Sequence, residues 1–451
     1  MEFSAVILAA GKGTRMNSDL PKVAHTIAGR PILQHVIDAV RGAGSQEVIL
    51  VLGFGREIVC RNLDNGKDLR VAVQEQQLGT GHALMQAERL LPKSGTILVV
   101  NGDTPLLRGQ TLSVLLNFHW KSGSEATVMT AILDNPFGYG RVIRTTGGLF
   151  DRIVEEKDAN NEERKIREVN SGVYCFQTES VCQALHELKN DNGQHEYYLP
   201  DVLKILRQKR KPISVFAADG SQDEIKGVND HIQQAEAEFI LRQRKNRQLM
   251  TEGVTIIDPA TTYIDWQVTV DRDSVILPGT FLTGSTHIGK NCTIGPYAHI
   301  SDSDIADRCV IQQAWLDRVE VCADCTVGPF VNLRRRTILQ DNAHIGSFVE
   351  VKNCQIGSNS AVPHLSYLGD AQVGSRVNIG AGTITCNFDG RTKQETVIED
   401  DALIGSNTNL IAPVKIGSHA MTGAGSSISQ DVPSGCLVVE RSNPVTKRMK
   451  K

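Results

Sequence analysis

An aliphatic side chain recurs every six residues through the C-terminal part of the sequence, and many of these positions are followed by glycine. The steps stay in phase over long runs, at Ile288, Ile294 and Ile300, at Val321, Val327 and Leu333, at Leu339, Ile345 and Val351, and at Ile398, Ile404, Leu410 and Ile416. A six-residue period is typical of a parallel β-helix, in which three short strands form one triangular coil and the aliphatic residues stack inside it. Unrelated strands would not keep one spacing over so many steps, so the sequence predicts this scaffold.

The repeat is interrupted between residues 344 and 387. The segments Pro363-His364-Leu-Ser-Tyr367 and Gly380-Ala-Gly-Thr-Ile-Thr-Cys-Asn387 break the pattern and bring polar residues together. A regular scaffold that is broken where polar residues gather indicates a functional site.

Chain length and charge limit what the protein can be. With 451 residues the chain is too long for one ordinary core, so two or three domains are expected. The net charge is -3 and 22% of the residues are charged, which argues against nucleic acid or an anionic membrane as the main partner. The apolar run 3–10 is short and lacks a preceding basic region, so it does not predict a signal peptide. Apolar stretches stay below the roughly eighteen residues of a membrane helix, and we expect a cytoplasmic protein.

The ten cysteines fit that compartment because they are scattered and show no dense disulfide pattern. Cys292, Cys309 and Cys354 lie within hexapeptides, where a small apolar side chain packs readily. Cys322 and Cys325 have the spacing of a metal-binding pair. Without a second pair or nearby histidines, packing is favoured over zinc.

The N-terminal half has a different pattern, in which β-rich runs alternate with helix-like segments. The β-rich runs are 4–10, 47–52, 70–73, 96–100 and 126–133, and the helix-like segments include 31–41 and 81–90. This order predicts a Rossmann-like α/β fold with a mostly parallel sheet flanked by helices. Ligands of such sheets bind at the carboxyl ends of the strands. Gly11-Lys-Gly-Thr-Arg15 follows the first strand and Asn101-Gly-Asp103 follows the fourth, so we expect a site there.

A connecting helix is expected over residues 231–250, which contain no glycine or proline. Arg242, Arg244, Lys245 and Arg247 could contact RNA, although charges on one helix more often form a solvated face. We therefore expect a first domain over 1–228, a linker helix over 229–250 and a β-helix domain over 251–451.

The glycine-rich loop after the first strand matches neither common nucleotide motif. The Walker pattern fails at Val6 and Gly13, and the dinucleotide pattern fails at Met16. What remains is a loop whose backbone N–H groups can bind phosphate oxygens, with Arg15 and Lys22 adding positive charge. An ordinary strand-to-helix turn is the alternative.

Several motifs of the N-terminal half resemble those of sugar-nucleotide pyrophosphorylases. They are Leu8-Ala-Ala-Gly-Lys-Gly-Thr-Arg-Met16 with Pro21-Lys22, Gln77-Leu-Gly-Thr-Gly81, Gly102-Asp103, Gly138-Tyr-Gly140 and Asn170-Ser-Gly172. The hexapeptide half adds His364-Leu-Ser-Tyr-Leu-Gly-Asp370 and Asn378-Ile-Gly-Ala-Gly-Thr-Ile-Thr-Cys-Asn387. Nearly end to end, the chain resembles the bacterial family of bifunctional N-acetylglucosamine-1-phosphate uridylyltransferases/glucosamine-1-phosphate acetyltransferases. The resemblance implies an α/β nucleotidyltransferase domain followed by a left-handed parallel β-helix, and the synthesis of UDP-N-acetylglucosamine.

For the first domain, the resemblance implies attack of a sugar 1-phosphate on UTP, with Mg2+ bound by Asp103 and Asn229. A sugar phosphate is already an anion, so the protein must position two repelling phosphates and neutralise charge. One carboxylate and one amide oxygen suit Mg2+, which completes its shell with water and substrate phosphates. The residues implied to bind UTP or the sugar nucleotide are Leu8, Ala9, Gly11, Gly13, Arg15, Lys22, Gln74, Gln77, Gly79, Thr80, Gly102, Asp103, Gly140, Glu155, Asn170 and Asn229. Gln76 and Glu156 remain alternatives for the uracil-binding glutamine and for Glu155.

For the second domain, the resemblance implies acetyl transfer from acetyl-CoA to glucosamine 1-phosphate. A neutral amine must attack the thioester, so a base near neutral pH is needed, and His364 is the candidate, with Glu350 to orient it. The residues implied to bind glucosamine 1-phosphate are Arg334, Lys352, Tyr367 and Asn378. Asn387 is assigned to the sugar and to acetyl-CoA, and the other acetyl-CoA residues are Ala381, Phe388, Ser406, Ala424 and Arg441, with Lys447, Arg448, Lys450 and Lys451 available to its phosphates.

The chain departs from the family pattern at three places. Asn332-Leu-Arg-Arg-Arg336 stands in place of Arg-Leu-Arg-Pro-Gly, so a neighbour of Arg334 could take its role. Pro363 stands where glycine commonly precedes the histidine, and Phe388 where tyrosine commonly follows the asparagine. Two other functions stay open: a nucleotidyltransferase with a purely structural β-helix, and a non-catalytic structural trimer.

A homotrimer is expected from the β-helix. The flat faces of a triangular coil pack naturally around a threefold axis, and closed symmetry is common among soluble homo-oligomers. Arg334 and Lys352 lie early in the repeat and Arg441 lies at its end, which one narrow prism would not bring together. We therefore expect the acetyltransferase sites to lie between subunits.

Overall fold

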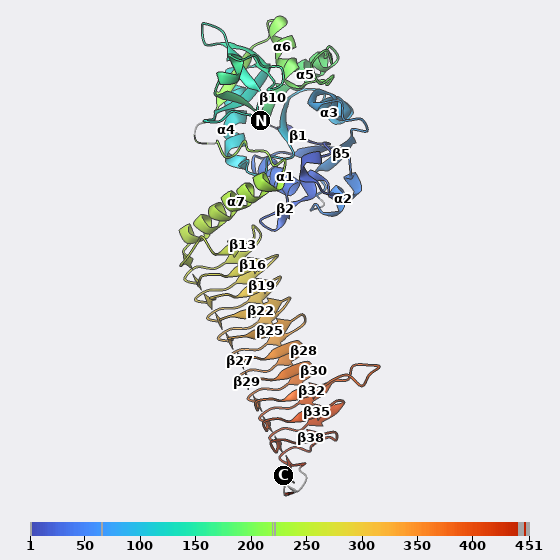
Figure 1. Cartoon of the computed structure of the whole chain (residues 1–451), viewed down its shortest axis with the longest axis vertical. Helices are drawn as coiled ribbons and strands as arrows, with labels where there is room; N and C mark the ends of the chain where they lie inside the picture. The colour runs from blue at the N-terminus through green and yellow to red at the C-terminus, as the bar shows by residue number, and fades with distance from the viewer. Residues whose placement is uncertain (1, 65, 219, 221, 441–445, 448–451) are drawn as a thin grey trace. The chain divides into compact units, whose positions relative to one another are not determined.

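The computed structural model describes residues 2–64, 66–218, 220, 222–440 and 446–447. Its contacts divide the chain into two compact units, Met1–Leu241 and Arg242–Lys451 (Figure 1). One helix, α7 (His231–Thr251), crosses this division. Among the described residues, every helix is too short or too polar to cross a membrane.

The first unit contains a mixed sheet whose centre is parallel. In the described residues its order is β11-β7-β10-β6-β1-β4-β5, and β8 and β9 form a hairpin that pairs with β10. β1 pairs in parallel with β4 and β6, whereas β10 runs antiparallel between β6 and β7. The strands are β1 Phe3–Ala9, β4 Glu47–Leu52, β5 Leu69–Val73, β6 Thr96–Asn101, β7 Ala126–Ile132, β8 Arg141–Arg144, β9 Phe150–Val154, β10 Glu168–Gln177 and β11 Ile213–Ala217, with a separate ribbon of β2 Thr26–Ile27 and β3 Arg30–Pro31. The predicted α/β class is confirmed.

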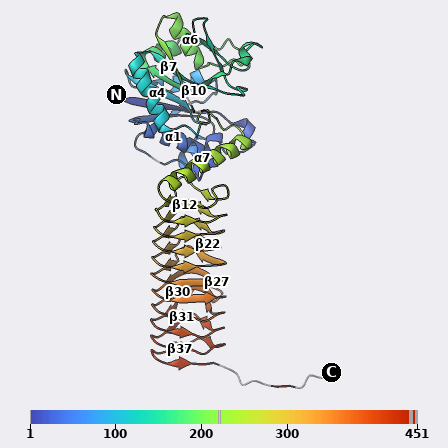
Figure 2. The ribbon, with the colours of Figure 1, turned by 90° about the vertical axis from the view of Figure 1, so that its left-hand side faces the viewer.

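Both faces of this sheet are covered by helices. Along β1, Ala5 and Ile7 belong to one hydrophobic core and Val6 and Leu8 to the other, because neighbouring side chains of a strand point to opposite faces. Side chains of α1, α2 and α4 pack in the first core and those of α3, α5 and α6 in the second; Figure 2 shows α1 and α4 together. The helices are α1 Ile32–Gly42, α2 Arg56–Arg61, α3 Thr80–Ala87, α4 Gly109–Ser122, α5 Thr178–Leu185 and α6 Pro200–Gln208.

The helix that the sequence predicts over 81–90 ends earlier, at Ala87. Residues Glu88–Leu90 form a 3-10 turn, and Leu91 is extended with φ -67 and ψ 147. Leu91 precedes Pro92, whose ring disfavours helical backbone at the residue before it, so the helix cannot continue.

The second unit is a left-handed parallel β-helix, whose stacked coils are seen in Figure 2. Consecutive coils pair in register, for example Ile276 with Ile294 and Ile294 with Ile311. The aliphatic residues therefore stack into one continuous core, which also contains Cys292 and Cys309. The six-residue period thus predicted this fold correctly.

Two parallel sheets make up its described coils. The first contains β12 Thr255–Ile256, β15 Val275–Ile276, β18 Thr293–Ile294, β21 Val310–Ile311, β24 Thr326–Val327, β27 His344–Ser347, β29 Ala361–His364, β31 Asn378–Ile379, β34 Leu403–Ile404, β37 Met421–Thr422 and β39 Leu437–Val438. The second bends around two sides of the coil and contains β13 Tyr263–Ile264, β14 Thr269–Val270, β16 Phe281–Thr283, β17 His287–Ile288, β19 His299–Ser301, β20 Asp304–Ile305, β22 Ala314–Asp317, β23 Glu320–Val321, β25 Val331–Arg334, β26 Ile338–Leu339, β28 Glu350–Ile356, β30 Tyr367–Val373, β32 Ile384–Cys386, β33 Thr396–Ile398, β35 Asn409–Ile411, β36 Val414–Ile416 and β38 Ser427–Ile428.

One coil carries a loop, residues 387–395, between β32 and β33. Figure 1 shows this loop projecting from the solenoid beside β32. Phe388 and Lys393 form an antiparallel bridge within it, and Asp389 accepts hydrogen bonds from the N–H groups of Arg391 and Thr392. The loop is therefore a built turn that follows the second interruption of the repeat.

Candidate active sites

The first candidate site lies at the carboxyl edge of the sheet, where β1 has β6 on one side and β4 on the other. At such a switch point the loops that follow the two strands leave a crevice between them. Here the loop after β1 contains two 3-10 turns, Thr14–Met16 and Lys22–Ala24. Two adjoining cavities, of 310 and 360 Å³, open at this edge and share Thr80, Asn101 and Asp103.

The smaller cavity brings together residues that the sequence assigned to the nucleotide. Gln74 is buried, and its side-chain amide donates to the Gly79 carbonyl oxygen at 3.1 Å, which fixes the loop between β5 and α3. The expected residues that line this cavity are Leu8, Ala9, Gly11, Lys22, Gln74, Gln77, Gly79, Thr80 and Asp103.

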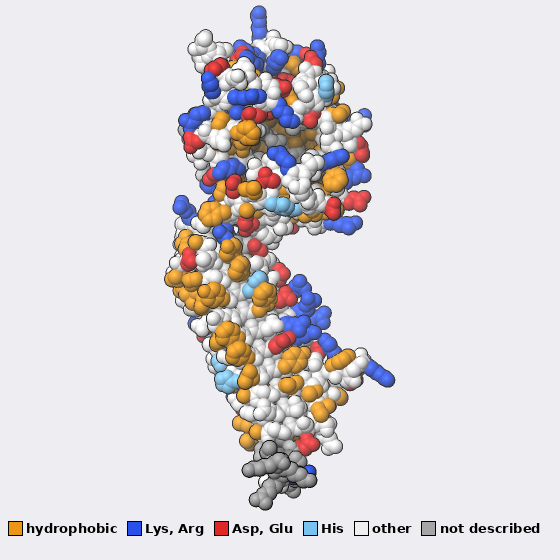
Figure 3. Space-filling model, in the orientation of Figure 1, with side chains coloured by type: hydrophobic (Ala, Val, Ile, Leu, Met, Phe, Trp, Pro, Cys, Tyr) orange, Lys and Arg blue, Asp and Glu red, His pale blue; other side chains and the backbone are white. Residues whose placement is uncertain are grey.

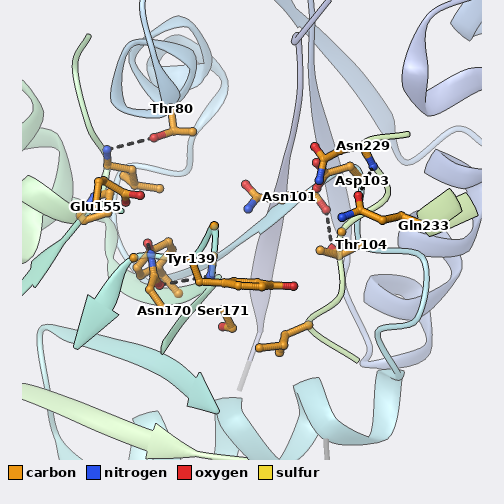
Figure 4. Close-up of a pocket in the computed structure, with 18 of the residues that line it drawn as sticks. Thr80, Asn101, Asp103, Thr104, Tyr139, Glu155, Asn170, Ser171, Asn229 and Gln233 are labelled. Atoms are coloured by element: carbon orange, nitrogen blue, oxygen red, sulfur yellow. Dashed lines mark hydrogen bonds between the residues drawn. The ribbon is translucent and has the colours of Figure 1, made fainter. Parts of the chain in front are cut away.

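The larger cavity brings together residues that the sequence assigned mainly to the sugar and the metal. Figure 4 shows Glu155 and Asn170 on one side, Asp103 and Asn229 on the other, and the Tyr139 ring between them. The expected residues that line it are Arg15, Thr80, Asp103, Gly140, Glu155, Asn170 and Asn229.

Lys22, Asp103 and Asn229 meet where the two cavities adjoin. Lys22 Nζ donates to Asp103 Oδ2 at 2.5 Å and to Asn229 Oδ1 at 3.0 Å. Backbone hydrogen bonds fix the positions of Asp103 and Asn229. Val228 N–H donates to the Asp103 carbonyl oxygen and Asn229 N–H donates to Gln233 Oε1, each at 2.8 Å. The Lys22 side chain is 13% exposed and the Asp103 side chain 23% exposed, so the cluster is largely shielded from solvent.

The oxygens of Asp103 and Asn229 fit a divalent cation such as Mg2+. They converge on one positive group, the Lys22 ammonium, so two hard oxygen ligands already face a common point. Within the described part of the chain, no three His, Cys, Asp or Glu side chains gather as a metal cluster. A cation held here would therefore take most of its ligands from water and from substrate phosphates, as Mg2+ commonly does.

Glu155 lies in the wall of the larger cavity. Burial, together with the nearby carboxylates of Asp158, Asp201 and Glu196, raises the pKa of Glu155 to about 7. Its neighbour Asn170 is fixed by donating from Nδ2 to the Tyr174 hydroxyl at 2.7 Å. A carboxyl group that changes charge near neutral pH, beside an anchored amide, is suited to bind sugar hydroxyls.

An ion pair between a buried arginine and a half-buried glutamate lies next to this wall along the chain. Arg141 and Glu156 each follow a cavity residue, Gly140 and Glu155, and Arg141 Nη2 donates to Glu156 Oε2 at 2.8 Å. The Arg141 side chain is 2% exposed. Gly138 N–H also donates to Glu156 Oε2, at 3.1 Å. The pair therefore ties the segment 138–141 to the end of β9.

Two expected residues, Gly13 and Gly102, lie outside both linings. Gly13 has a left-handed φ of 64, and a Cβ there would lie 2.5 Å from the Lys22 Cβ. Gly102 N–H donates to the Leu8 carbonyl oxygen at 2.8 Å. Both glycines thus shape the loops that carry the other residues.

Sequence reasoning missed several lining residues, namely Asn101, Thr104, Phe137, Tyr139, Tyr174 and Gln233. Asn101 and Tyr139 lie within motifs named in the sequence, Asn101-Gly-Asp103 and Gly138-Tyr-Gly140, so both could have been predicted as site residues. Gln233 carried none, because its contact with the Asn229 backbone exists only once α7 has folded against the preceding loop.

The second candidate site lies on one edge of the β-helix. Arg334 and Lys352 pair in register on β25 and β28, and Lys352 pairs with Gly369 on β30. A Cβ at Gly369 would lie 2.5 Å from the Tyr367 hydroxyl and 2.7 Å from Asn387 Nδ2. The missing side chain therefore lets Tyr367 and Asn387 close over Gly369, beside Lys352 on the preceding coil.

Positive charge gathers on this edge, and Figure 3 shows basic side chains over the middle coils. Contact with Lys393 of the projecting loop, and to a lesser extent Arg334, lowers the pKa of Lys352. Lys393 Nζ also lies 4.0 Å from Asp370 Oδ2. Arg335 approaches Asp317 at 4.0 Å, so the structure places Arg334 nearer to Lys352 than its neighbour. Cations that crowd together in this way suit a phosphate.

His364 is exposed at the end of β29, where it pairs in register with Ser347. Glu350 pairs in register with Tyr367, and its carboxylate accepts a hydrogen bond from Arg334 Nη1 at 2.9 Å. The structure thus pairs Glu350 with the arginine, and its role in orienting His364 stays a prediction.

Small residues form a column on the coils that follow His364. The carbonyl oxygens of His364, Ala381 and Ser406 each accept a hydrogen bond from the next coil, at 3.4, 2.7 and 2.8 Å. Ala424 lies on the coil after Ser406, where a Cβ at Gly405 would lie 2.6 Å from its nitrogen. The residues that the sequence assigned to acetyl-CoA, Ala381, Ser406 and Ala424, thus follow one another on successive coils.

The remaining expected residues are dispersed. Asn378 is exposed at the start of β31, Phe388 is 60% exposed in the projecting loop, and Lys447 is exposed. Arg441, Arg448, Lys450 and Lys451 lie outside the described residues.

Comparison with known proteins places the whole chain. Three family models match it: a MobA-like NTP transferase domain over residues 5–201, a GMPPB C-terminal domain over 261–367 and the bacterial transferase hexapeptide (six repeats) over 395–430. The bifunctional protein GlmU of Syntrophomonas wolfei is 52% identical over 441 residues, which cover 98% of each chain. The bifunctional protein GlmU of Halalkalibacterium halodurans is 46% identical, over 98% of this chain and 97% of its own. That of Heliobacterium modesticaldum is 49% identical, over 97% of this chain and 95% of its own. The chain belongs to the bifunctional GlmU family.

Membership of the GlmU family confirms the resemblance drawn from the sequence motifs. The family joins a nucleotidyltransferase domain to a hexapeptide acetyltransferase domain, so both units of this chain are transferases. The alternatives in which the β-helix is catalytically inert do not fit that family. Its nucleotidyltransferase domain uses a divalent metal, in agreement with the oxygen pair at Asp103 and Asn229.

Proposed function

We propose that this chain makes UDP-N-acetylglucosamine in two steps. The solenoid site transfers an acetyl group from acetyl-CoA to glucosamine 1-phosphate, and the sheet-edge site then transfers UMP from UTP to N-acetylglucosamine 1-phosphate. The observation that supports this proposal is the presence of basic side chains at two separate places, Lys22 at the sheet edge of the first unit and Arg334 with Lys352 on the solenoid edge of the second, where each can bind a phosphate.

At the sheet edge, an oxygen of the sugar phosphate attacks the α-phosphorus of UTP. A new P–O bond forms while the bond to the bridging oxygen of the β-phosphate breaks, and pyrophosphate leaves with that electron pair. The nucleophile is already an anion, so catalysis depends on alignment and charge neutralisation rather than on a base. Arg15 lines the larger cavity and Lys22 the smaller, and Asp103 lines both, so the two cations can bind the repelling phosphates.

Asp103 and Asn229 are the residues that would hold Mg2+. Bound there, the ion would offset the charge of the UTP phosphates. Gln233 keeps Asn229 in place by accepting its backbone N–H at 2.8 Å. On the far side of the cavity, Glu155 and Asn170 bind the sugar hydroxyls, so the acceptor phosphate points toward Asp103.

At the solenoid, the neutral amine of glucosamine 1-phosphate attacks the thioester carbon. A C–N bond forms and the C–S bond breaks, and His364 takes the proton that nitrogen loses and returns it to the departing CoA sulfur. Arg334 and Lys352 bind the sugar phosphate, and Tyr367 and Asn387 bind its hydroxyls. The column of small residues below His364 receives acetyl-CoA.

The solenoid is also proposed to assemble as a homotrimer. Aromatic rings stack along one face of the described coils, with centroid separations of 4.7, 5.7 and 4.0 Å through Tyr263, Phe281, His299 and Trp315. At the adjoining corner, Phe330 and Phe348 stack at 5.1 Å and are 54% and 59% exposed. An exposed apolar surface of this kind marks an interface, and a second copy around a threefold axis is the simplest occupant of a flat solenoid face.

The register connects this apolar surface to the site. Trp315 pairs with Asn332, which pairs with Glu350, which pairs with Tyr367. The aromatic stack and the Tyr367 cluster therefore lie on one face, and a copy packed on the stack would also cover the exposed cluster.

Replacement of Trp315 by glutamate tests the trimer. Light scattering should give the mass of three chains for the parent and a smaller mass for Trp315→Glu, with acetyl transfer lost in parallel and uridylyl transfer kept. Leu149→Glu is the matched control, because Leu149 is 73% exposed in the first unit. A monomeric parent with full acetyltransferase activity would contradict the proposal.

We further propose a cytoplasmic location. All ten cysteines are free thiols, which suits a reducing compartment.

A coupled assay tests the two-step reaction. The full-length protein would receive glucosamine 1-phosphate, acetyl-CoA, UTP and Mg2+, with CoA thiol and pyrophosphate measured separately. We expect thiol release without UTP, and pyrophosphate release that requires either acetyl-CoA or added N-acetylglucosamine 1-phosphate. Equal pyrophosphate release from glucosamine 1-phosphate alone would overturn the order, and absence of thiol release would remove the acetyl transfer step.

A further inference from the structure

Lys22 occupies the point on which the two proposed metal ligands converge. Its ammonium nitrogen lies 2.5 Å from Asp103 Oδ2 and 3.0 Å from Asn229 Oδ1. Mg2+ binds oxygen ligands at about 2.0–2.1 Å, so an ion shared by these two oxygens would overlap the position of the ammonium. The ammonium and the divalent ion therefore cannot occupy this point together.

We propose that the Lys22 ammonium is an internal counter-ion that excludes divalent cations from Asp103 and Asn229 until nucleotide phosphates draw it away. This inference rests on the proposed function, because it takes Asp103 and Asn229 as the metal ligands. It adds a second role for Lys22, which binds the ligand oxygens in the free enzyme and the phosphates in the loaded one.

The free enzyme has a physical reason to keep Lys22 in this position. The Lys22 and Asp103 side chains are 13% and 23% exposed, so each charge is poorly hydrated and depends on its partner. A cation that binds without nucleotide must displace the ammonium, which then loses its contact with Asp103 and stands near a divalent charge in a shielded cavity. The free-energy cost of displacing the ammonium weakens the binding of the cation.

The lining of the cavities shows where the ammonium can go. Lys22 lines the smaller cavity, Asn229 the larger, and Asp103 both. The Lys22 backbone is held in the 3-10 turn Lys22–Ala24, close to Gly13, where a Cβ would lie 2.5 Å from the Lys22 Cβ. The base of the side chain is therefore fixed, and rotation of its flexible end into the smaller cavity brings the ammonium to the nucleotide side.

Cation and nucleotide loading are thereby coupled in both directions. UTP removes the ammonium from the ligands, and the cation releases the ammonium toward UTP, so each raises the affinity of the other. UTP also chelates divalent ions by itself, which would produce cooperativity in any enzyme of this kind. Cation binding without nucleotide is therefore the measurement that isolates the role of Lys22.

The test is a titration of full-length protein with Mn2+ in the absence of nucleotide, in which free Mn2+ is followed by electron paramagnetic resonance. Lys22→Met keeps the length of the side chain and removes its charge, and we expect it to bind Mn2+ about tenfold more tightly than the parent, within the usual range of coupling between sites. Lys12→Met is the matched control, because it removes the same charge from an exposed residue of the same loop and should change affinity less than threefold. Calorimetry of the full chain, which follows the melting of the first unit, verifies that each variant is folded.

The outcomes separate this inference from the proposed function. Affinity of Lys22→Met equal to or below that of the parent, or matched by Lys12→Met, would overturn the counter-ion role while leaving the metal site in place. Asp103→Ala introduced into Lys22→Met should abolish the tight Mn2+ site. If that double variant binds Mn2+ as tightly as Lys22→Met, then Asp103 is not a metal ligand and the proposed metal site itself fails.

Discussion

In the first unit the proposed catalytic groups line two adjoining cavities, whereas in the β-helix the corresponding groups lie on an exposed edge. The Lys22 and Asp103 side chains are 13% and 23% exposed, while those of Arg334 and Glu350 are 47% and 38% exposed. A sheet with long loops can surround a substrate by itself. A solenoid edge supplies one wall, and in the proposed trimer another copy would supply the second surface of the acetyl transfer site.

The same contrast governs electrostatics. In the first unit burial is the main cause of the raised pKa values of Glu155 and Tyr139. On the solenoid edge the lowered pKa of Lys352 results mainly from contact with another exposed cation, Lys393. Substitutions should therefore act through desolvation in one site and through neighbouring charge in the other.

The largest expected effect separates the two sites. Asp103→Ala removes the charged oxygen at the junction of the two cavities, and uridylyl transfer should fall about a thousandfold or more, as measured by pyrophosphate release. Acetyl transfer should stay within about twofold, because separate domains have separate cores. Asp134→Ala is the control, since Asp134 is 90% exposed in the same unit. Equal loss of both activities in folded Asp103→Ala would remove the distinction between the sites.

The reciprocal change tests the solenoid edge. His364→Ala should lower acetyl transfer by about a hundredfold, the usual contribution of a general base, and leave uridylyl transfer unchanged. His344→Ala is the matched control, because His344 lies on the preceding coil of the same sheet, in register with Ala361, and hydrogen-bonds to Thr326. Near-parent acetyl transfer by His364→Ala would assign the base to another residue.

The sequence predicted the two folds because each depends on a regular rule, whereas the residues expected at the sites came from the resemblance to the family. A six-residue period translates directly into register, as in the pairing of Ile276 with Ile294, and loops that follow parallel strands meet at one sheet edge. The contacts between those loops follow no such rule. Lys22 contacts Asp103 and Asn229, which lie 81 and 207 positions further along the chain. Their convergence appears only in the folded chain.

The pair Arg141–Glu156 was beyond sequence reasoning for the same reason. Glu156 was an alternative to Glu155 in the motif, and the structure separates them: Glu155 lines the cavity while Glu156 accepts from a buried arginine. Both residues follow the end of β9, so which of them faces the cavity depends on the turn after the strand and on how the hairpin is placed.

An intermediate effect is expected at this pair. Glu156→Gln keeps the shape of the side chain but removes the charge that holds Arg141, so the segment 138–141 should lose its fixed position. We expect the KM for N-acetylglucosamine 1-phosphate to rise about tenfold while the KM for UTP stays unchanged, because weakened positioning affects one substrate. Glu162→Gln, at an 81% exposed side chain, is the control. A parallel rise in both KM values would indicate general loss of structure instead.

The smallest expected effect is a gain in stability at Glu155. Folding raises the pKa of Glu155 from 4.5 to about 7, so the folded state favours the neutral acid and loses stability as the pH rises from 4.5 through 7. The full penalty is about 3 kcal/mol at 1.36 kcal/mol per pKa unit, and access of solvent from the cavity reduces it to roughly 1 kcal/mol.

Glu155→Gln should therefore raise the melting temperature of the first unit by about 2–4 °C at pH 8 and by much less at pH 5, as measured by calorimetry of the full chain. Glu350→Gln is the counterpart on the solenoid edge, where the carboxylate is bound by Arg334; it should not stabilise the chain at either pH. A stabilising effect of Glu155→Gln that is independent of pH would mean that the glutamate carries no burial penalty. The proposed distinction between a desolvated site and an exposed one would then rest on cavity shape alone.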